Sequence, residues 1–178
     1  MIHIAELPAG QVEQWSARDR TLTVERELNL RLVNGVLSYE VVAVAPYEKT
    51  YPSWQASSTE TVSFAAFFDG RVVGELDLSK GWNGYAHIEN LVVARNSRRQ
   101  GLARALMERG VEWAESQKLP GVMLETQNNN VAACELYRSC GFRLGGFDSD
   151  LYRGLDPSSR EIALFWYRNH IRSLRDDA

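Results

Sequence analysis

The sequence predicts an α+β (mixed α/β) fold, in which one mixed, mostly antiparallel β-sheet is flanked by helices and a splayed strand pair forms a cleft. Short runs rich in Val, Leu and Thr fill the first half of the chain, and the turn pairs Asn34-Gly35 and Asp69-Gly70 separate them. Helical periodicity first occurs after residue 97, where strand-like and helix-like segments begin to alternate. The chain has 178 residues, of which 44% are hydrophobic, and this suits one domain with one core.

Two hairpins dominate the first half of the chain. Asn34 and Gly35 both tolerate positive φ, as a tight hairpin turn requires, and Asp69-Gly70 gives a similar signal. The predicted segments are, in order, a weakly helical or irregular stretch over 1–20, strands over 21–32 and 36–45, an exposed loop over 46–60, and strands over 61–68 and 71–79.

Helices enter in the second half. Apolar residues recur at helical spacing from Leu102 to Trp113, and the helix is expected to stop before Pro120-Gly121. Asn130 can cap a second helix, which ends at Gly141. The predicted segments are a strand over 85–93, a helix over 98–117, a strand over 122–126, a helix over 131–140, and strands over 142–147 and 161–168.

The charge is uneven along an acidic chain. The net charge of -3 and pI near 5.7 argue against nucleic-acid binding, because such proteins need a basic surface to neutralise phosphates. Residues 95–109 nevertheless hold five arginines against the single acid Glu108. A small basic region in an acidic protein suits a polyanionic cofactor and a cationic substrate.

We expect a cytoplasmic protein. The sequence shows no signal peptide and no apolar run near the roughly 20 residues that span a bilayer. Cys134 and Cys140 lie six apart on a predicted helix and point away from each other, which disfavours a disulfide. The scattered His3, His87 and His170 show no metal-ligand spacing.

The segment that follows strand 85–93 has the features of an anion site. Arg98-Arg99-Gln100-Gly101-Leu102-Ala103 comes between a strand and a helix, so several backbone N–H groups at the helix start lack partners. Gly101 and the small Ala103 would let phosphate oxygens approach the backbone closely. An ordinary helix start with solvated arginines fits this short pattern as well, since glycine motifs alone are weak.

Arg98-x-x-Gly101-x-Ala103, followed by Asn130-x-x-Ala133-x-x-Leu136-Tyr137-x-x-Cys140-Gly141-Phe142, resembles the GNAT superfamily of acetyl-CoA-dependent N-acetyltransferases over about residues 60–168. More narrowly, Ala45-Pro46-Tyr47, Trp82-Asn83, Leu124-Glu125-Thr126-Gln127-x-Asn129-Asn130 and Phe165-Trp166-Tyr167 look like the streptothricin acetyltransferases. The resemblance implies a single GNAT-like domain, with residues 1–60 on the acceptor side and 61–168 as the acetyl-CoA-binding core.

The resemblance also implies a cofactor site. The backbone of Leu91 and Val93 would pair with the pantetheine arm, and the turn from Arg98 to Ala103 would hold the diphosphate. Asn130 would contact acetyl-CoA near its arm. The expected cofactor-binding residues are Leu91, Val92, Val93, Arg98, Arg99, Gln100, Gly101, Leu102, Ala103, Asn130 and Ala133.

Acetyl transfer to an alkyl amine needs a base, because the amine arrives protonated with a pKa of about 10.4. Simple alternation puts Tyr85, His87, Glu89 and Leu91 on one face of their strand, and Glu89 is the preferred base beside the cofactor strand. His87 is a second candidate, and a carboxylate that merely binds substrate or pairs with an arginine is the alternative for Glu89.

The expected acid is Tyr137. By the family resemblance its hydroxyl would protonate the leaving coenzyme A thiolate, whereas by position alone it is an ordinary core aromatic. An acyl-enzyme on Cys134 or Cys140 is disfavoured, since no histidine lies close in sequence and the resemblance implies direct transfer in a ternary complex.

The acceptor is expected to be a small cationic amine, most concretely the β-lysine amine of streptothricin. A different amine (polyamine, aminoglycoside or protein N-terminus) and a non-catalytic acetyl-CoA-binding module are the alternatives, and both monomer and homodimer stay open. Acidic side chains would supply negative potential and aromatic ones flat surfaces for cations. The residues with these properties are Glu75, Asp77, Glu89, Asp148 and Asp150, together with Tyr47, Trp82 and Tyr152.

Overall fold

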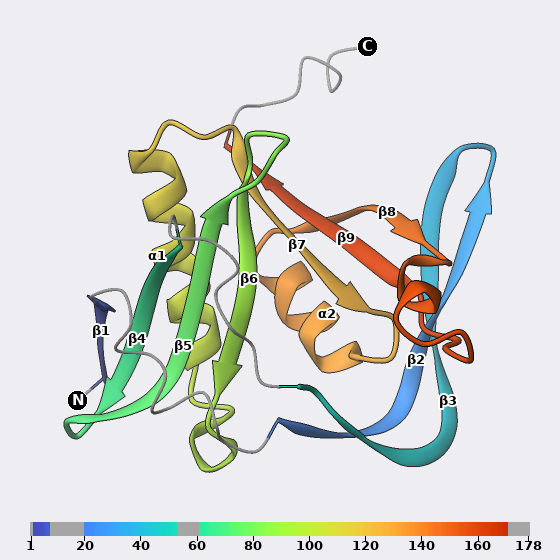
Figure 1. Ribbon diagram of the computed structural model, residues 1–178, viewed down its shortest axis with the longest axis horizontal. Helices are drawn as coiled ribbons and strands as arrows, with labels where there is room; N and C mark the ends of the chain where they lie inside the picture. Colours follow the sequence, from blue (N-terminus) through green and yellow to red (C-terminus); the bar gives the residue numbers. More distant parts are fainter. Residues whose placement is uncertain (1, 8–19, 53–60, 171–178) are drawn as a thin grey trace. The chain divides into compact units, whose positions relative to one another are not determined.

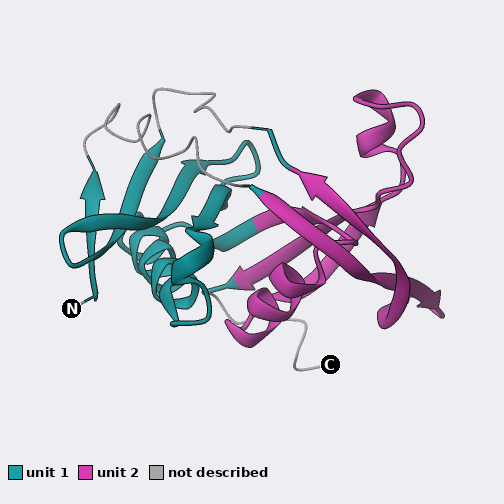
Figure 2. Cartoon of the chain, turned by 90° about the horizontal axis from the view of Figure 1, so that it is seen from below, with its two compact units in different colours: residues 1–20, 51–123, 169–178 teal, residues 21–50, 124–168 magenta. Residues whose placement is uncertain are grey.

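The computed structural model describes residues 2–7, 20–52 and 61–170 (Figure 1). The chain divides into two compact units (Figure 2). Unit 1 comprises residues 1–20, 51–123 and 169–178, and unit 2 comprises residues 21–50 and 124–168. The expected acceptor-side part over 1–60, the acetyl-CoA-binding core over 61–168 and the splayed strand pair stay predictions.

In unit 1, neighbouring strands follow the order β1-β4-β5-β6, and each of these three pairings is antiparallel. The turn between β4 and β5 has Asp69 at φ 48° and Gly70 at φ 76°, which confirms the predicted hairpin. β1 was not predicted, because a six-residue edge strand depends on pairing with β4 rather than on its own pattern. The strands are β1 (Ile2–Leu7), β4 (Val62–Phe68), β5 (Arg71–Lys80) and β6 (Ala86–Val93).

Helix α1 (Leu102–Ser116) packs against this sheet and follows the short 3-10 helix η1 (Arg95–Ser97) (Figure 1). Its buried stripe runs from Leu102 to Ala114, as the periodicity predicted, although the helix begins four residues later than expected. Gly110 allows the close approach: a Cβ there would lie 2.8 Å from a methyl carbon of Leu76. The face of β5 that carries Leu76 is therefore the face that α1 covers.

Strand β6 contains a β-bulge at Glu89. Asp77 and Leu78 are consecutive in β5, yet they pair with Asn90 and Ile88, so Glu89 is the extra residue. The prediction that His87 and Leu91 share a face is wrong for this reason. His87 pairs with Ser79 and Leu91 with Leu76, and these two partners lie three residues apart on β5, hence on opposite faces.

Unit 2 begins with the long hairpin of β2 (Thr21–Val33) and β3 (Val36–Thr50). Asn34 at φ 50° and Gly35 at φ 77° confirm the predicted turn. β3 extends to Thr50, so the expectation of a loop from residue 46 is wrong for 46–50, and residues 53–60 lie outside the described residues. Pro46 lies in a register shift of the hairpin, and cross-strand pairing resumes beyond it with Val24 opposite Tyr47.

The rest of unit 2 surrounds a buried tryptophan. The ring of Trp166 lies 6.2 Å from the rings of both Tyr39 and Tyr137, at edge-to-face angles. Asn130 accepts a 3.3 Å hydrogen bond from the Ala133 N–H, which confirms the predicted cap of α2. The elements are β7 (Gly121–Gln127), whose first three residues fall in unit 1, α2 (Val131–Ser139), β8 (Arg143–Asp148), η2 (Leu151–Gly154) and β9 (Ala163–Asn169), with strand order β7-β9-β8.

Candidate functional site

The carboxylate of Glu89 is held by two neighbours in unit 1. It accepts a 2.6 Å hydrogen bond from the Ser79 hydroxyl, and its oxygen lies 3.1 Å from Nδ1 of His87. The hydrogen bond with His87, followed by that from Ser79, lowers the pKa of Glu89 against the opposing effect of burial. With 23% of its side chain exposed, Glu89 is an ionised carboxylate that a proton can reach at neutral pH.

A second acidic group in unit 1 lies inside the protein. Asp77 accepts hydrogen bonds from the Ser63 hydroxyl and, at 2.8 Å, from the Asn90 amide, whose oxygen accepts from Arg20 at 3.3 Å. Burial and the neighbouring Asp77 raise the pKa of Glu75, which is 1% exposed. Asp77 thus lies in a buried polar network and Glu75 is buried near it, and the expected contact of both carboxyl groups with substrate stays a prediction.

The turn before α1 has the backbone shape of an anion cradle. Arg99 has φ 64° and Gly101 has φ 81°, and Gly101 is the N-cap of α1. The first turn of α1 contains no acidic side chain, so nothing there opposes the positive end of the helix dipole. Nε of Arg98 donates to the Val93 carbonyl at 3.1 Å and thereby ties the turn to the end of β6.

Not every expected cofactor residue can use its side chain. Leu102 is 2% exposed and packs in the core of unit 1, so only its backbone is available to a ligand. Arg98, Arg99 and Gln100 are exposed, while Leu91 and Val92 are half-buried and Val93 is buried. Contacts of these residues with a cofactor stay predictions.

In unit 2, α2 carries Asn130, Ala133 and Tyr137 on successive turns. Tyr137 is 8% exposed, and its ring packs against Phe142 and Trp166. The side-chain oxygen of Asn130 is used as the helix cap. Burial raises the pKa of Cys134 to about 12, so this thiol stays protonated at neutral pH and is a poor nucleophile.

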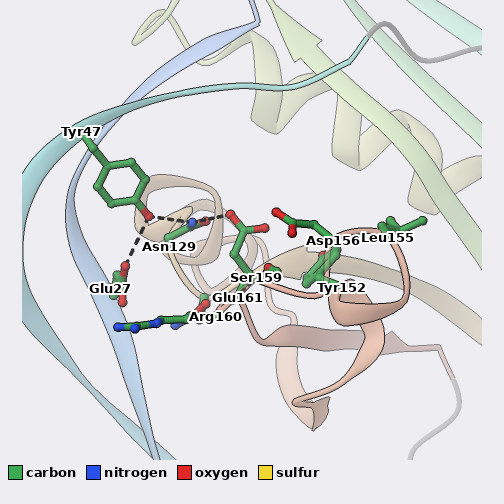
Figure 3. A pocket seen from close by; sticks show the side chains of 10 residues that line it. Glu27, Tyr47, Asn129, Tyr152, Leu155, Asp156, Ser159, Arg160 and Glu161 are labelled. Atoms are coloured by element: carbon green, nitrogen blue, oxygen red, sulfur yellow. Dashed lines mark hydrogen bonds between the residues drawn. The ribbon is translucent and has the colours of Figure 1, made fainter.

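Unit 2 also holds a pocket of about 550 Å³ (Figure 3). Its wall includes two of the predicted acceptor residues, Tyr47 and Tyr152, and three carboxylates that were not predicted. Only one lining side chain, Arg160, is cationic, so the pocket favours cations. The lining residues are Glu27, Tyr47, Asn128, Asn129, Tyr152, Leu155, Asp156, Ser159, Arg160 and Glu161.

One amide joins two sides of this pocket, as the dashed lines in Figure 3 show. The nitrogen of Asn129 lies 2.8 Å from a carboxylate oxygen of Glu161 and 3.0 Å from the hydroxyl of Tyr47. The Tyr47 hydroxyl in turn donates to Glu27 at 3.3 Å. Burial raises the pKa of Tyr47, and the hydroxyl therefore remains a donor at neutral pH. Lys49 forms an ion pair with Glu161.

Asn128 links the two chain segments that carry Glu27 and Glu161. Its backbone bonds with Leu28 of β2 at 2.9 Å and with Ile162 at 3.0 Å, while its side-chain oxygen accepts from the Ile162 N–H at 3.0 Å. Leu28 and Ile162 directly follow Glu27 and Glu161 in the chain. Asn128, which is buried, thus sets the positions of two pocket carboxylates.

Other predicted acceptor residues do not line this pocket. Trp82 is 99% exposed. Asp148 accepts backbone hydrogen bonds from Asp150 at 2.8 Å and Leu151 at 3.1 Å, in the turn that leads into η2. Asp150 pairs with Arg153 at 3.0 Å. A substrate role for any of the three stays a prediction.

Most residues of the pocket were not predicted from the sequence. Asn129 belongs to the Gln127-x-Asn129-Asn130 motif that resembles the streptothricin acetyltransferases, and this motif could have indicated it as a site residue. Glu27, Asp156 and Glu161 have no such signal, because they are single acids next to strands or turns, and such residues are usually solvated.

Comparison with known proteins gives a consistent picture. Residues 28–142 match the model of the acetyltransferase (GNAT) family. The chain is 43% identical over 175 residues to a streptothricin acetyltransferase from Escherichia coli, covering 98% of this chain and 99% of that protein.

Two solved structures resemble the chain over nearly its whole length. A candidate streptothricin acetyltransferase from Bacillus anthracis, crystallised with acetyl coenzyme A, aligns with a TM-score of 0.86 at 36% identity and covers 95% of this chain and 99% of that chain. A nourseothricin acetyltransferase aligns with a TM-score of 0.80 at 29% identity and covers 94% and 98%. In the described ranges, no helix is long and apolar enough to cross a membrane.

Proposed function

Because this chain belongs to the acetyltransferase (GNAT) family, we propose that it transfers the acetyl group of acetyl-CoA to an amine of streptothricin, the β-lysine amine in particular. The observation that carries the proposal is the 43% identity to a streptothricin acetyltransferase over 98% of this chain. The acidic pocket around Glu161 supports it independently, because a cationic acceptor needs such a wall.

Acetyl-CoA is the co-substrate, and we assign its diphosphate to the turn from Arg98 to Ala103. Helix N-termini bind phosphate groups through their unpaired N–H groups and their dipole. Gly101 leaves open space where a side chain would stand, since no described atom lies within 4 Å of an added Cβ. Exposed guanidinium groups at Arg98 and Arg99 add positive charge beside the same backbone.

In the proposed reaction, Glu89 removes a proton from the acceptor ammonium, directly or through water. The free amine attacks the thioester carbonyl, the C–S bond breaks, and the acetyl group remains on nitrogen as an amide. The hydroxyl of Tyr137 gives its proton to the leaving thiolate, and general acid catalysis of this kind contributes about 10²-fold or more. His87, bonded to Glu89, helps to keep that carboxylate ionised.

A thiol-release assay with acetyl-CoA tests the proposal. Turnover with streptothricin supports it. Turnover only with a polyamine, an aminoglycoside or a peptide N-terminus would identify another acceptor, and acetyl-CoA binding without turnover would indicate a binding module.

Since acetyl-CoA is the co-substrate, we place the activity in the cytoplasm, and localisation of a tagged chain checks this.

A further inference from the structure

One carboxylate that lines the pocket of unit 2, that of Glu161, is already paired with a cation that is not itself a lining residue. Lys49 stands on β3 and places its ammonium on the carboxylate of Glu161, while Asn129 donates to the same carboxylate oxygen at 2.8 Å. Both charged side chains are mostly buried, at 16% and 26% exposed. An ion pair of this kind loses much of its hydration, so its partners attract other charges more strongly than a solvated pair does.

From this contact we infer that Glu161 is the carboxylate that recognises a cationic group of the acceptor. The ammonium of Lys49 occupies the position of that cationic group until the acceptor binds. The inference rests on the proposed function, because it names the residues that select the acceptor in that reaction. Glu161 is suited to the role: it lines the pocket, and Asn129 holds it in one orientation.

The orientation of Asn129 is determined by chemistry. A carboxylate only accepts hydrogen bonds, so the amide nitrogen must face Glu161, and the same nitrogen serves the Tyr47 hydroxyl. The amide oxygen of Asn129 therefore faces away from Glu161. It is buried in a side chain that is 3% exposed, and no described residue donates to it. The acceptors that the wall presents are the carboxylates of Glu27, Asp156 and Glu161, and an ammonium or guanidinium group brings donors only.

The remaining charges of the wall point the same way. Glu27 and Asp156 add two further carboxylates, against Arg160 as the only cation among the lining residues. Without Lys49 the wall has a formal charge of -2, and with Lys49 it has -1. An acceptor cation that replaces the Lys49 ammonium keeps Glu161 paired, and the exchange requires the displaced ammonium to swing on its flexible stem into solvent.

Two substitutions on one ion pair test the inference. Glu161→Gln removes the recognition charge and should raise KM for streptothricin about tenfold, the effect of losing one charge-assisted hydrogen bond. Lys49→Met removes the competing cation and should lower that KM by about two- to fivefold, as expected for a partly exposed pair. KM for acetyl-CoA should change in neither variant. If the ion pair were purely structural, both variants would instead raise KM for streptothricin. Any result other than a raised KM in Glu161→Gln and a lowered KM in Lys49→Met overturns the inference.

Two controls keep the result interpretable. Lys49→Arg retains the positive charge and should leave KM near the wild-type value, and Lys49→Gln, which also removes the charge, replaces the methionine variant if that protein fails to fold. Arg31→Met and Glu40→Gln disrupt an exposed ion pair of 2.7 Å elsewhere on the β2–β3 hairpin, and they should not change KM for streptothricin.

Calorimetric titration with streptothricin in the absence of acetyl-CoA separates this inference from the proposed function. If streptothricin binds the wild type more tightly than Glu161→Gln but the wild type shows no turnover, the cation site is supported and the proposed reaction is rejected. If the wild type turns over streptothricin and Glu161→Gln has the same KM, the proposed reaction is supported and the cation site at Glu161 is rejected.

Discussion

The hydroxyl of Ser79 lies 2.6 Å from a carboxylate oxygen of Glu89, across the β5–β6 ladder at the point where β6 bulges. Because Glu89 is the unpaired residue of the bulge, its side chain is aimed where it can meet both Ser79 and His87. His87 and then Ser79 lower the pKa of Glu89, so its carboxylate is ionised at neutral pH, as the proposed base requires.

A proton acceptor with a lowered pKa gives kcat/KM an acid limb below about 4.5, the ordinary glutamate value. Ser79→Ala removes one bond to the ionised form and should move this limb to higher pH. Glu89→Gln should abolish the limb and most of the activity. The measurement is kcat/KM for the acceptor against pH, with saturating acetyl-CoA. A wild-type limb near neutrality would point to a histidine base instead.

Tyr137→Phe should lower kcat by about 10²-fold while leaving the fold intact. The phenyl ring can keep the packing against Trp166 and Phe142, so only the hydroxyl is lost. Steady-state kinetics and thermal unfolding of the same preparation check both parts. An unchanged kcat would remove Tyr137 from the reaction, and a large fall in unfolding temperature would mean that the hydroxyl has a structural role.

Local signals in the sequence predicted local structure well. Asn34-Gly35, Asp69-Gly70 and the Asn130 cap each depend on the conformation of a few adjacent residues, and the structure has all three where they were expected. The fold class followed from their order along the chain, since the expected antiparallel hairpins and two helices are present.

Features that depend on distant partners were not predictable in this way. The bulge at Glu89 exists only through its register with β5, and it overturned the simple alternation of faces. The pocket of unit 2 combines Glu27 with Glu161, which are far apart in sequence, through hydrogen bonds made by Asn128 and Asn129. Neither acid differs in its local pattern from a solvated one.

Gly101→Ala should raise KM for acetyl-CoA severalfold and leave KM for the acceptor unchanged. With φ at 81°, a Cβ at this position costs about 1–2 kcal/mol and distorts the start of α1. Gly35→Ala is the matched control, because Gly35 has φ 77°, an added Cβ would also meet no described atom within 4 Å, and the residue lies in the β2–β3 turn. Equal effects of both variants on KM for acetyl-CoA would mean that strain alone, not the anion cradle, explains the result.

The buried carboxyl of Glu75 should make the stability of the protein depend on pH. Burial and Asp77 raise its pKa in the folded chain to about 9, from an ordinary value of 4.5. A raised folded-state pKa means that the stabilising contribution is complete below the unfolded value and is lost as pH rises from 4.5 through about 9. The wild-type unfolding temperature should therefore fall across this range.

Glu75→Gln replaces the protonated carboxyl by a neutral group of the same shape, so it should cost little near pH 5 and should raise the unfolding temperature above wild type near pH 9. Thermal unfolding of both proteins across this pH range is the measurement. Asp77→Asn is the contrasting variant: it disturbs an acceptor that both Ser63 and Asn90 use, and should destabilise the protein at every pH. If the unfolding temperatures of Glu75→Gln and the wild type changed with pH in parallel, the pKa of Glu75 would be the same in the folded and unfolded chains, and the raised folded-state pKa would have to be abandoned.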